Sequence, residues 1–105
     1  MTNKDLQREY RRLNERFFGG QLPMDATVKF SDMDRSDLGL CSGETIEISN
    51  AIKNIDNFVY VVLLHEMAHL SLPEYAGYPS EGGHGMRFQA ELVRLFNAGA
   101  YDNLL

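Results

Sequence analysis

Apolar side chains recur at helical spacing near the start of the chain. Between Lys4 and Phe18 they fall every three or four residues, at Leu6, Tyr10, Leu13 and Phe17. This spacing predicts an amphipathic helix. Gly19-Gly20 and Pro23 follow directly and predict that the helix ends there.

Two short segments with strand character follow this helix. Thr27–Phe30 is predicted to be a strand. Thr45–Ile48 alternates polar and apolar residues, as a half-buried strand does. The stretch between them, Ser31–Leu40, is acidic and resembles a turn, and Ala51–Asp56 is predicted to form a helical turn.

The most apolar segment, Asn57–Leu72, is long enough to predict a buried helix rather than a strand. Its successor, Ser71–Gly83, contains two prolines and three glycines and is predicted to be an irregular loop. A last helix is predicted to start near His84 and run to about Asn97, with apolar residues at Phe88, Leu92 and Leu95. No repeat or linker interrupts the pattern, so residues 1–105 are predicted to form a single domain.

Composition narrows the class of protein. The 105 residues are 44% hydrophobic and 24% charged, as in an ordinary globular domain. A single cysteine, Cys41, excludes an internal disulfide and a Cys-x-x-Cys zinc ribbon. The longest apolar run, Phe58 to Leu64, is far shorter than the roughly 20 residues of a membrane span. With no apolar signal core at the N-terminus, we expect a cytoplasmic protein without membrane association.

Charge is distributed unevenly along the chain. Residues 1–20 hold five basic and three acidic residues, whereas residues 21–105 hold five basic and twelve acidic ones. This acidic body argues against tight nucleic-acid binding by the domain as a whole. Arg8, Arg12 and Arg16 form a basic row on the first helix, and such a row is either a solvated face or a contact strip for phosphates or an acidic partner.

The chemistry of the chain is concentrated in His65-Glu66-Met67-Ala68-His69. Residues four apart on a helix share one face, so two imidazoles at this spacing can bind one metal ion. Glu66 flanks the ion without ligating it, and its carboxylate is then able to act as a general base toward a bound water. A catalytic zinc site takes three protein ligands and a water, and the third histidine of the chain, His84, supplies the last ligand.

Other interpretations of these residues remain open. In one alternative, two of the histidines are core residues satisfied by hydrogen bonds and the third is an ordinary surface residue. The charge of Glu66 would then be buried without a partner, which is energetically costly. A closed structural zinc site would need a fourth ligand such as Cys41. The rival third ligands are Glu74, Glu81 and Glu91.

Four sequence blocks resemble the SprT-like metallopeptidase family, which includes the Spartan DNA–protein crosslink proteases. They are Leu13–Pro23 with its Gly-Gly-Gln-Leu-Pro ending, Glu44–Ser49, Leu63–His69, and His84-Gly85-x-x-Phe88. The metzincin extension is absent, since Leu72 and Tyr75 stand where its glycine and third histidine would be. No zinc ribbon of the kind many relatives carry is present, so a minimal form is expected.

The resemblance implies a minimal zincin-like α+β domain with a small antiparallel sheet beside the active-site helix. It also implies that His65, His69 and His84 bind zinc, with Glu66 as the general base. In such a domain the strand Thr45–Ile48 either holds an extended peptide, by adding it to the sheet edge, or simply presents its polar face to solvent. Tyr75 and Tyr78 are candidates for stabilising the oxyanion. The expected substrate is a protein or peptide; action on DNA-associated proteins follows from the family, but the acidic body supports it weakly.

Two further hypotheses concern how the domain works. In one, the chain is a non-catalytic, metal-stabilised module that docks a partner through the basic row of its first helix. In the other, the domain acts only when another chain recruits it. The Glu66→Gln substitution separates the first from catalysis, because it would abolish turnover by an enzyme and leave a docking module unaffected.

Overall fold

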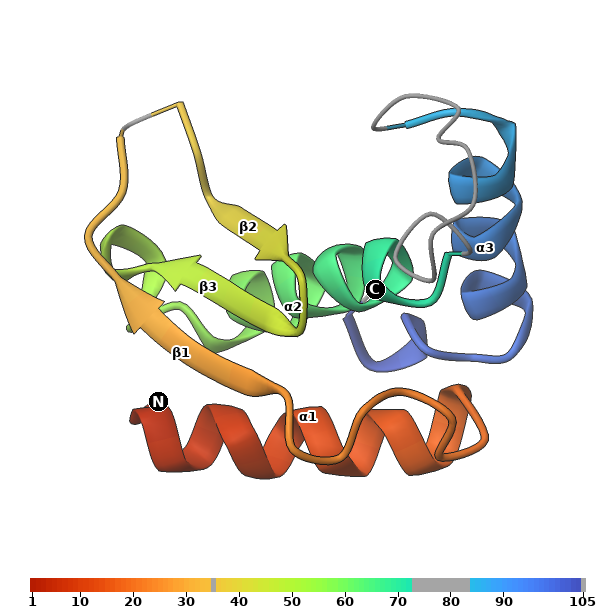
Figure 1. Cartoon of the computed structure of the whole chain (residues 1–105), viewed down its shortest axis with the longest axis horizontal. Coiled ribbons are helices and arrows are strands. Elements are labelled where there is room, and N and C mark those ends of the chain that lie inside the picture. The colour runs from red at the N-terminus through yellow and green to blue at the C-terminus, as the bar shows by residue number, and fades with distance from the viewer. Residues whose placement is uncertain (35, 73–83, 105) are drawn as a thin grey trace.

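A helix, a three-stranded sheet and two further helices follow one another in the computed structural model of this chain (Figure 1). The structure describes residues 1–34, 36–72 and 84–104. The predicted α+β class is confirmed. None of the described helices is long and apolar enough to cross a membrane.

Helix α1 (Asn3–Phe17) begins at a capping box, in which Thr2 and Asp5 each accept a hydrogen bond from the other's backbone N–H. Leu6, Tyr10 and Leu13 of its apolar stripe are buried, and Phe17 is partly buried against the core. Asn14 on the same face is also buried, and its amide group both donates to Leu22 O and accepts from Leu22 N, at 3.0 Å each. These two bonds hold the Gly-Gly turn that follows the helix.

The sheet consists of β1 (Thr27–Ser31), β2 (Gly39–Ser42) and β3 (Thr45–Ser49), in the order β1-β3-β2. β1 is parallel to β3 and β2 is antiparallel to it, so the sheet is mixed and the expected all-antiparallel sheet was wrong. β2 was missed because its four residues, Gly-Leu-Cys-Ser, carry little strand signal.

The position of β3 overturns a second expectation. β3 lies between β1 and β2 and pairs with both, so Thr45–Ile48 is not an edge that could receive a peptide. A central strand has already used its backbone N–H and C=O groups on both sides. The edges of this sheet are β1 and β2.

One face of the sheet forms the core. The residues that point to this face are Val28, Phe30, Ile46 and Ile48, and all are buried. α1 contacts β1, while α2 contacts β2 and β3. On the other face the alternate residues of β1 and β3 are polar, and Lys29 forms an ion pair with Glu47 there at 3.9 Å.

After a short 3-10 helix (η1, Asn50–Ile52), helix α2 (Asp56–Leu70) runs through the middle of the domain, as its apolar sequence predicted. Helix α3 (Met86–Asn97) packs Phe88 and Leu95 into the core. The last turn, η3 (Asp102–Leu104), ends the described chain. α3 begins two residues after His84 and ends at Asn97, close to the predicted bounds.

Candidate metal centre

Three histidines from two separate segments converge at the C-terminal half of α2. His65 and His69 lie one turn apart on the helix, and His84 comes from the segment that leads into α3. One ring nitrogen from each lies within 4.8 Å of the other two. The three nitrogens thus form a cluster able to hold a metal ion.

The spacing within the cluster fits a tetrahedral ion. Two nitrogens about 2.05 Å from such an ion are separated by roughly 3.3 Å, and His65 Nε2 lies 3.2 Å from His84 Nε2. Both burial and the nearby His84 lower the pKa of His65. The lowered pKa favours neutral imidazole, which is the form that binds metal.

The aromatic ring of Phe88 on α3 packs against all three histidine rings. Its ring stacks on His69 with centroids 4.2 Å apart, and it lies 4.9 Å from the rings of both His65 and His84. Phe88 itself is 1% exposed. It therefore limits the orientations open to all three imidazoles.

Glu66 is buried beside the histidines, with only 6% of its surface exposed. Burial raises the pKa of its carboxyl from 4.5 to about 7. A carboxyl group with such a pKa can both accept and return a proton near neutral pH, which is what general acid–base catalysis requires.

Gly39 of β2 makes this burial possible. A β-carbon at position 39 would lie 2.9 Å from Glu66 Oε2 and 2.7 Å from Val62 Cγ1. The strand backbone thus packs directly on the Glu66 side chain. Sequence reasoning missed this residue, because a single glycine in an acidic, turn-like stretch carries no signal of what lies against it.

Next to the histidines, a cleft of about 280 Å³ opens between β2 and α2. His65 and Glu66 form part of its wall, so the candidate site is accessible from outside. The other lining residues are Ser36, Asp37, Leu38, Gly39, Val61 and Val62.

Several of the alternative ligands lie elsewhere. Glu91 accepts a hydrogen bond from Ser71 Oγ at 2.6 Å and pairs with Arg94. Neither Glu91 nor Cys41 belongs to the histidine cluster, which is the one group of side chains in the described part of the chain that could hold a metal ion. The remaining candidates, the third ligands Glu74 and Glu81 and the oxyanion residues Tyr75 and Tyr78, lie outside the described residues.

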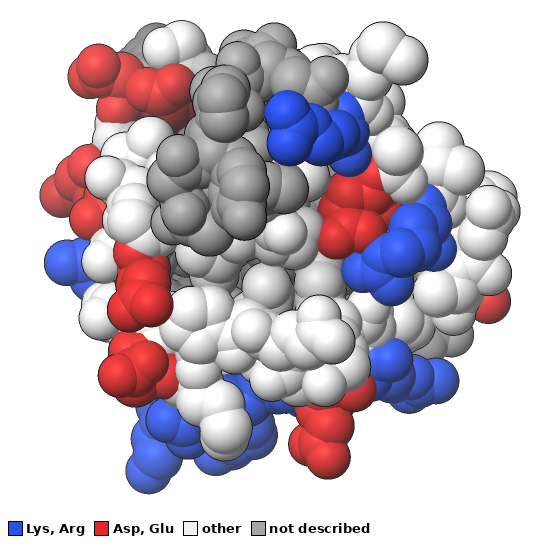
Figure 2. All heavy atoms as spheres, turned by 45° about the vertical axis from the view of Figure 1, so that its right-hand side comes forward, with Lys and Arg blue, Asp and Glu red and all other residues white. Residues whose placement is uncertain are grey.

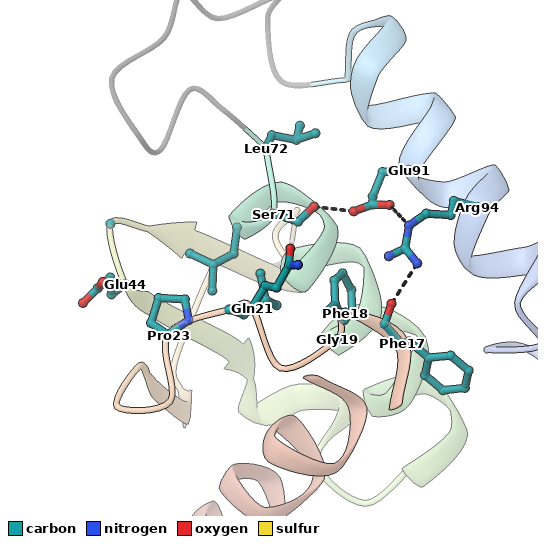
Figure 3. Close-up of a pocket in the computed structure, with 13 residues that line it drawn as sticks. Phe17, Phe18, Gly19, Gln21, Pro23, Glu44, Ser71, Leu72, Glu91 and Arg94 are labelled. Atoms are coloured by element: carbon teal, nitrogen blue, oxygen red, sulfur yellow. Dashed lines mark hydrogen bonds and ion pairs between the residues drawn. The ribbon is translucent and has the colours of Figure 1, made fainter. Parts of the chain in front are cut away.

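A second cavity, of about 740 Å³, lies away from the histidines (Figure 3). It is bounded by the turn after α1, the β2–β3 turn, the end of α2 and one side of α3. Arg94 crosses it from α3, donating to Phe17 O at 2.8 Å while pairing with Glu91. This contact joins α3 to the end of α1.

The basic row on α1 is exposed but has partners within the chain. Arg8 pairs with Asp5 at 3.7 Å, Arg12 pairs with Glu9, and Arg16 lies over the Phe17 ring. These contacts favour the solvated face over a free phosphate-binding strip. On the face shown in Figure 2, acidic and basic groups are likewise interspersed.

The comparison with protein families agrees with this architecture. The SprT-like family matches the chain over residues 6–101, nearly its whole length, and the chain belongs to that family. Its members are generally zinc metallopeptidase-like. No curated protein sequence matches the chain. The matched range contains the whole sheet, helix α2 and all three histidines.

Proposed function

We propose that residues 1–105 form a single zinc metallopeptidase domain that hydrolyses peptide bonds in protein or peptide substrates. The observation that supports this most directly is the juxtaposition of three converging imidazoles and a buried carboxyl group, Glu66, at an open cleft. Three neutral nitrogen ligands with space for a water are the donor set of a catalytic zinc site.

In this proposal His65, His69 and His84 hold the ion. When bound, zinc lowers the pKa of a water to about 7 and polarises a carbonyl group. The carboxylate of Glu66 accepts a proton from the attacking water and returns it to the departing amine nitrogen. The raised pKa of Glu66 suits both transfers.

The substrate is proposed to bind along β2. Among the described strands β2 is an edge of the sheet, since it pairs there with β3 alone, and its Gly39 forms part of the wall of the cleft. An extended peptide can add to such an edge through backbone hydrogen bonds. β2 thus takes the place of β3 as the proposed peptide-binding strand, because β3 is paired on both sides.

The decisive test is a comparison of wild-type protein, Glu66→Gln and His84→Ala after reconstitution with zinc. Zinc content and cleavage of an unfolded protein substrate are measured on the same samples. We expect Glu66→Gln to keep its zinc and lose cleavage, and His84→Ala to lose both.

Arg94→Lys serves as a control outside the cleft, and it should keep both properties. Undiminished cleavage by Glu66→Gln would refute the role of Glu66. If the wild-type protein fails to bind zinc, the enzyme assignment is wrong.

A further inference from the structure

The cleft beside the candidate metal centre has an apolar wall. Val61 and Val62 of α2 face Leu38, which immediately precedes β2, across a cavity of about 280 Å³. This volume is close to the lower end of small-molecule sites. It accommodates a single side chain together with the backbone that carries it.

Two of these wall residues are unusually exposed for their size. Val61 is 39% exposed and Leu38 is 37% exposed, and both line the same cleft. One turn before Val61, Phe58 is 42% exposed, and Phe58, Val61 and His65 are spaced by three and four along α2. Such spacing places them on one face of the helix, so an exposed apolar strip leads to the first histidine.

The occupant of this cleft follows from what else lines it. His65 and Glu66 belong to the same wall, so a group bound in the cleft lies next to the reacting groups. β2 is the sheet edge at this place, and a peptide added to an edge points alternate side chains toward the face of the sheet that α2 covers. The natural occupant is therefore a side chain of the substrate itself.

We propose that this cleft is the specificity pocket of the enzyme and selects an apolar side chain close to the scissile bond. The inference rests on the proposed function. Val61 and Leu38 supply the apolar surface, and Asp37 at the same cleft disfavours an acidic side chain by repulsion between carboxylates.

Binding can be tested without turnover. The probes are extended alanine-based hexapeptides that carry one leucine, or one glutamate, at each position in turn. Their affinities for zinc-loaded Glu66→Gln protein are measured by calorimetry or by NMR titration. At one position, leucine should bind at least about tenfold more tightly than alanine, the scale expected for apolar groups in a pocket, and glutamate should bind more weakly than alanine.

Two variants in the Glu66→Gln background locate the effect. Val61→Asp should abolish the leucine preference. Val93→Asp places the same charge at a position on α3 that is 57% exposed and outside the cleft, and it should keep the preference. Circular dichroism spectra and melting temperatures establish that both variants are folded.

The failure of this inference differs from the failure of the proposed function. If the wild-type protein with zinc cleaves the peptides without regard to leucine, the pocket is refuted and the peptidase stands. If Val61→Asp retains the leucine preference, the pocket is refuted, and cleavage by the wild-type protein decides the peptidase separately. If the leucine preference is present in binding but no peptide or protein is cleaved, the pocket stands and the peptidase is refuted.

Discussion

Gly39 and Glu66 are in direct contact between two elements that are distant in sequence. A β-carbon on Gly39 would approach Glu66 Oε2 to 2.9 Å, so the β2 backbone lies against the carboxyl group of α2. The strand excludes water from one side of the carboxyl group and restricts its rotamers. The same contact therefore connects the burial, the raised pKa and the orientation of Glu66.

Replacing Gly39 with alanine should disturb Glu66 without removing any metal ligand. The added methyl group overlaps Val62 and Glu66 and forces one of them, or the strand, to move. We expect zinc content near that of the wild type and a fall in kcat of at least about tenfold, because small displacements of a catalytic group are costly. Steady-state cleavage assays and metal analysis of the same samples test this.

Leu40→Ala is the matched control for Gly39→Ala. Leu40 is a neighbour on the same strand but points to the opposite face, across from Glu47. The Leu40→Ala substitution should therefore leave both zinc content and kcat close to wild-type values. Equal losses in the two variants would mean that β2 tolerates no change, and the specific role of Gly39 would be wrong.

Zinc should stabilise the folded protein through all three histidines together. A ligand that binds only the folded state raises the free energy of unfolding by about 2.7 kcal/mol at 100 times its Kd. Adding zinc should therefore raise the Tm of the wild type by several degrees and that of His84→Ala much less. Thermal unfolding with and without chelator measures the difference, and an identical zinc-induced shift in the variant would exclude His84 as a ligand.

Phe88→Leu should weaken zinc binding although Phe88 offers no ligand atom. The smaller side chain frees the three rings that pack on Phe88, and loss of a group that orients ligands typically lowers metal affinity ten- to a hundredfold. We expect about a tenfold loss, with a fall in stability of roughly 1 to 3 kcal/mol. Competition with a fluorescent zinc chelator reports the affinity, and denaturation of the metal-free protein reports the stability.

Leu95→Ala separates these two effects. Leu95 is fully buried on the same helix but has no aromatic ring to stack on the histidines. Its truncation should therefore lower the free energy of unfolding by about 2 to 5 kcal/mol and leave zinc affinity unchanged. If both variants lose affinity in proportion to their stability, Phe88 is only a core residue.

Glu66 should make the stability of the metal-free protein depend on pH. Its pKa is about 7 in the folded protein and 4.5 in the unfolded chain, so the folded state retains a proton that the unfolded state releases between these values. The free energy of unfolding should therefore fall as pH rises from 4.5 through 7, by up to roughly 3 kcal/mol.

The contribution of Glu66 is isolated by comparing wild-type protein with Glu66→Gln in urea titrations between pH 5 and pH 8. Both proteins contain the same titratable groups apart from Glu66, so the difference between them reports on that residue. The variant should be relatively more stable at pH 8 than at pH 5. A difference between the two proteins that is constant with pH would show that the Glu66 pKa is not raised.

Local patterns in the sequence were sufficient to predict the helices and to single out the three histidines as candidate metal ligands. The apolar stripe of α1 and the apolar length of α2 are short-range properties, and the spacing of His65 and His69 fixes their common face once the helix exists. The SprT-like family assignment was also within reach, because its blocks occur in order along the chain. The roles of these residues in metal binding and catalysis remain predictions.

The strand order and the surroundings of the site were decided only by tertiary structure. β2 has almost no propensity signal, and its place at the sheet edge depends on long-range pairing with β3. Likewise, neither Gly39 against Glu66 nor Phe88 beneath the imidazoles follows from sequence spacing, since each contact joins separate elements. Periodicity determines which face of an element is buried, but what lies against that face is determined by how the whole chain packs.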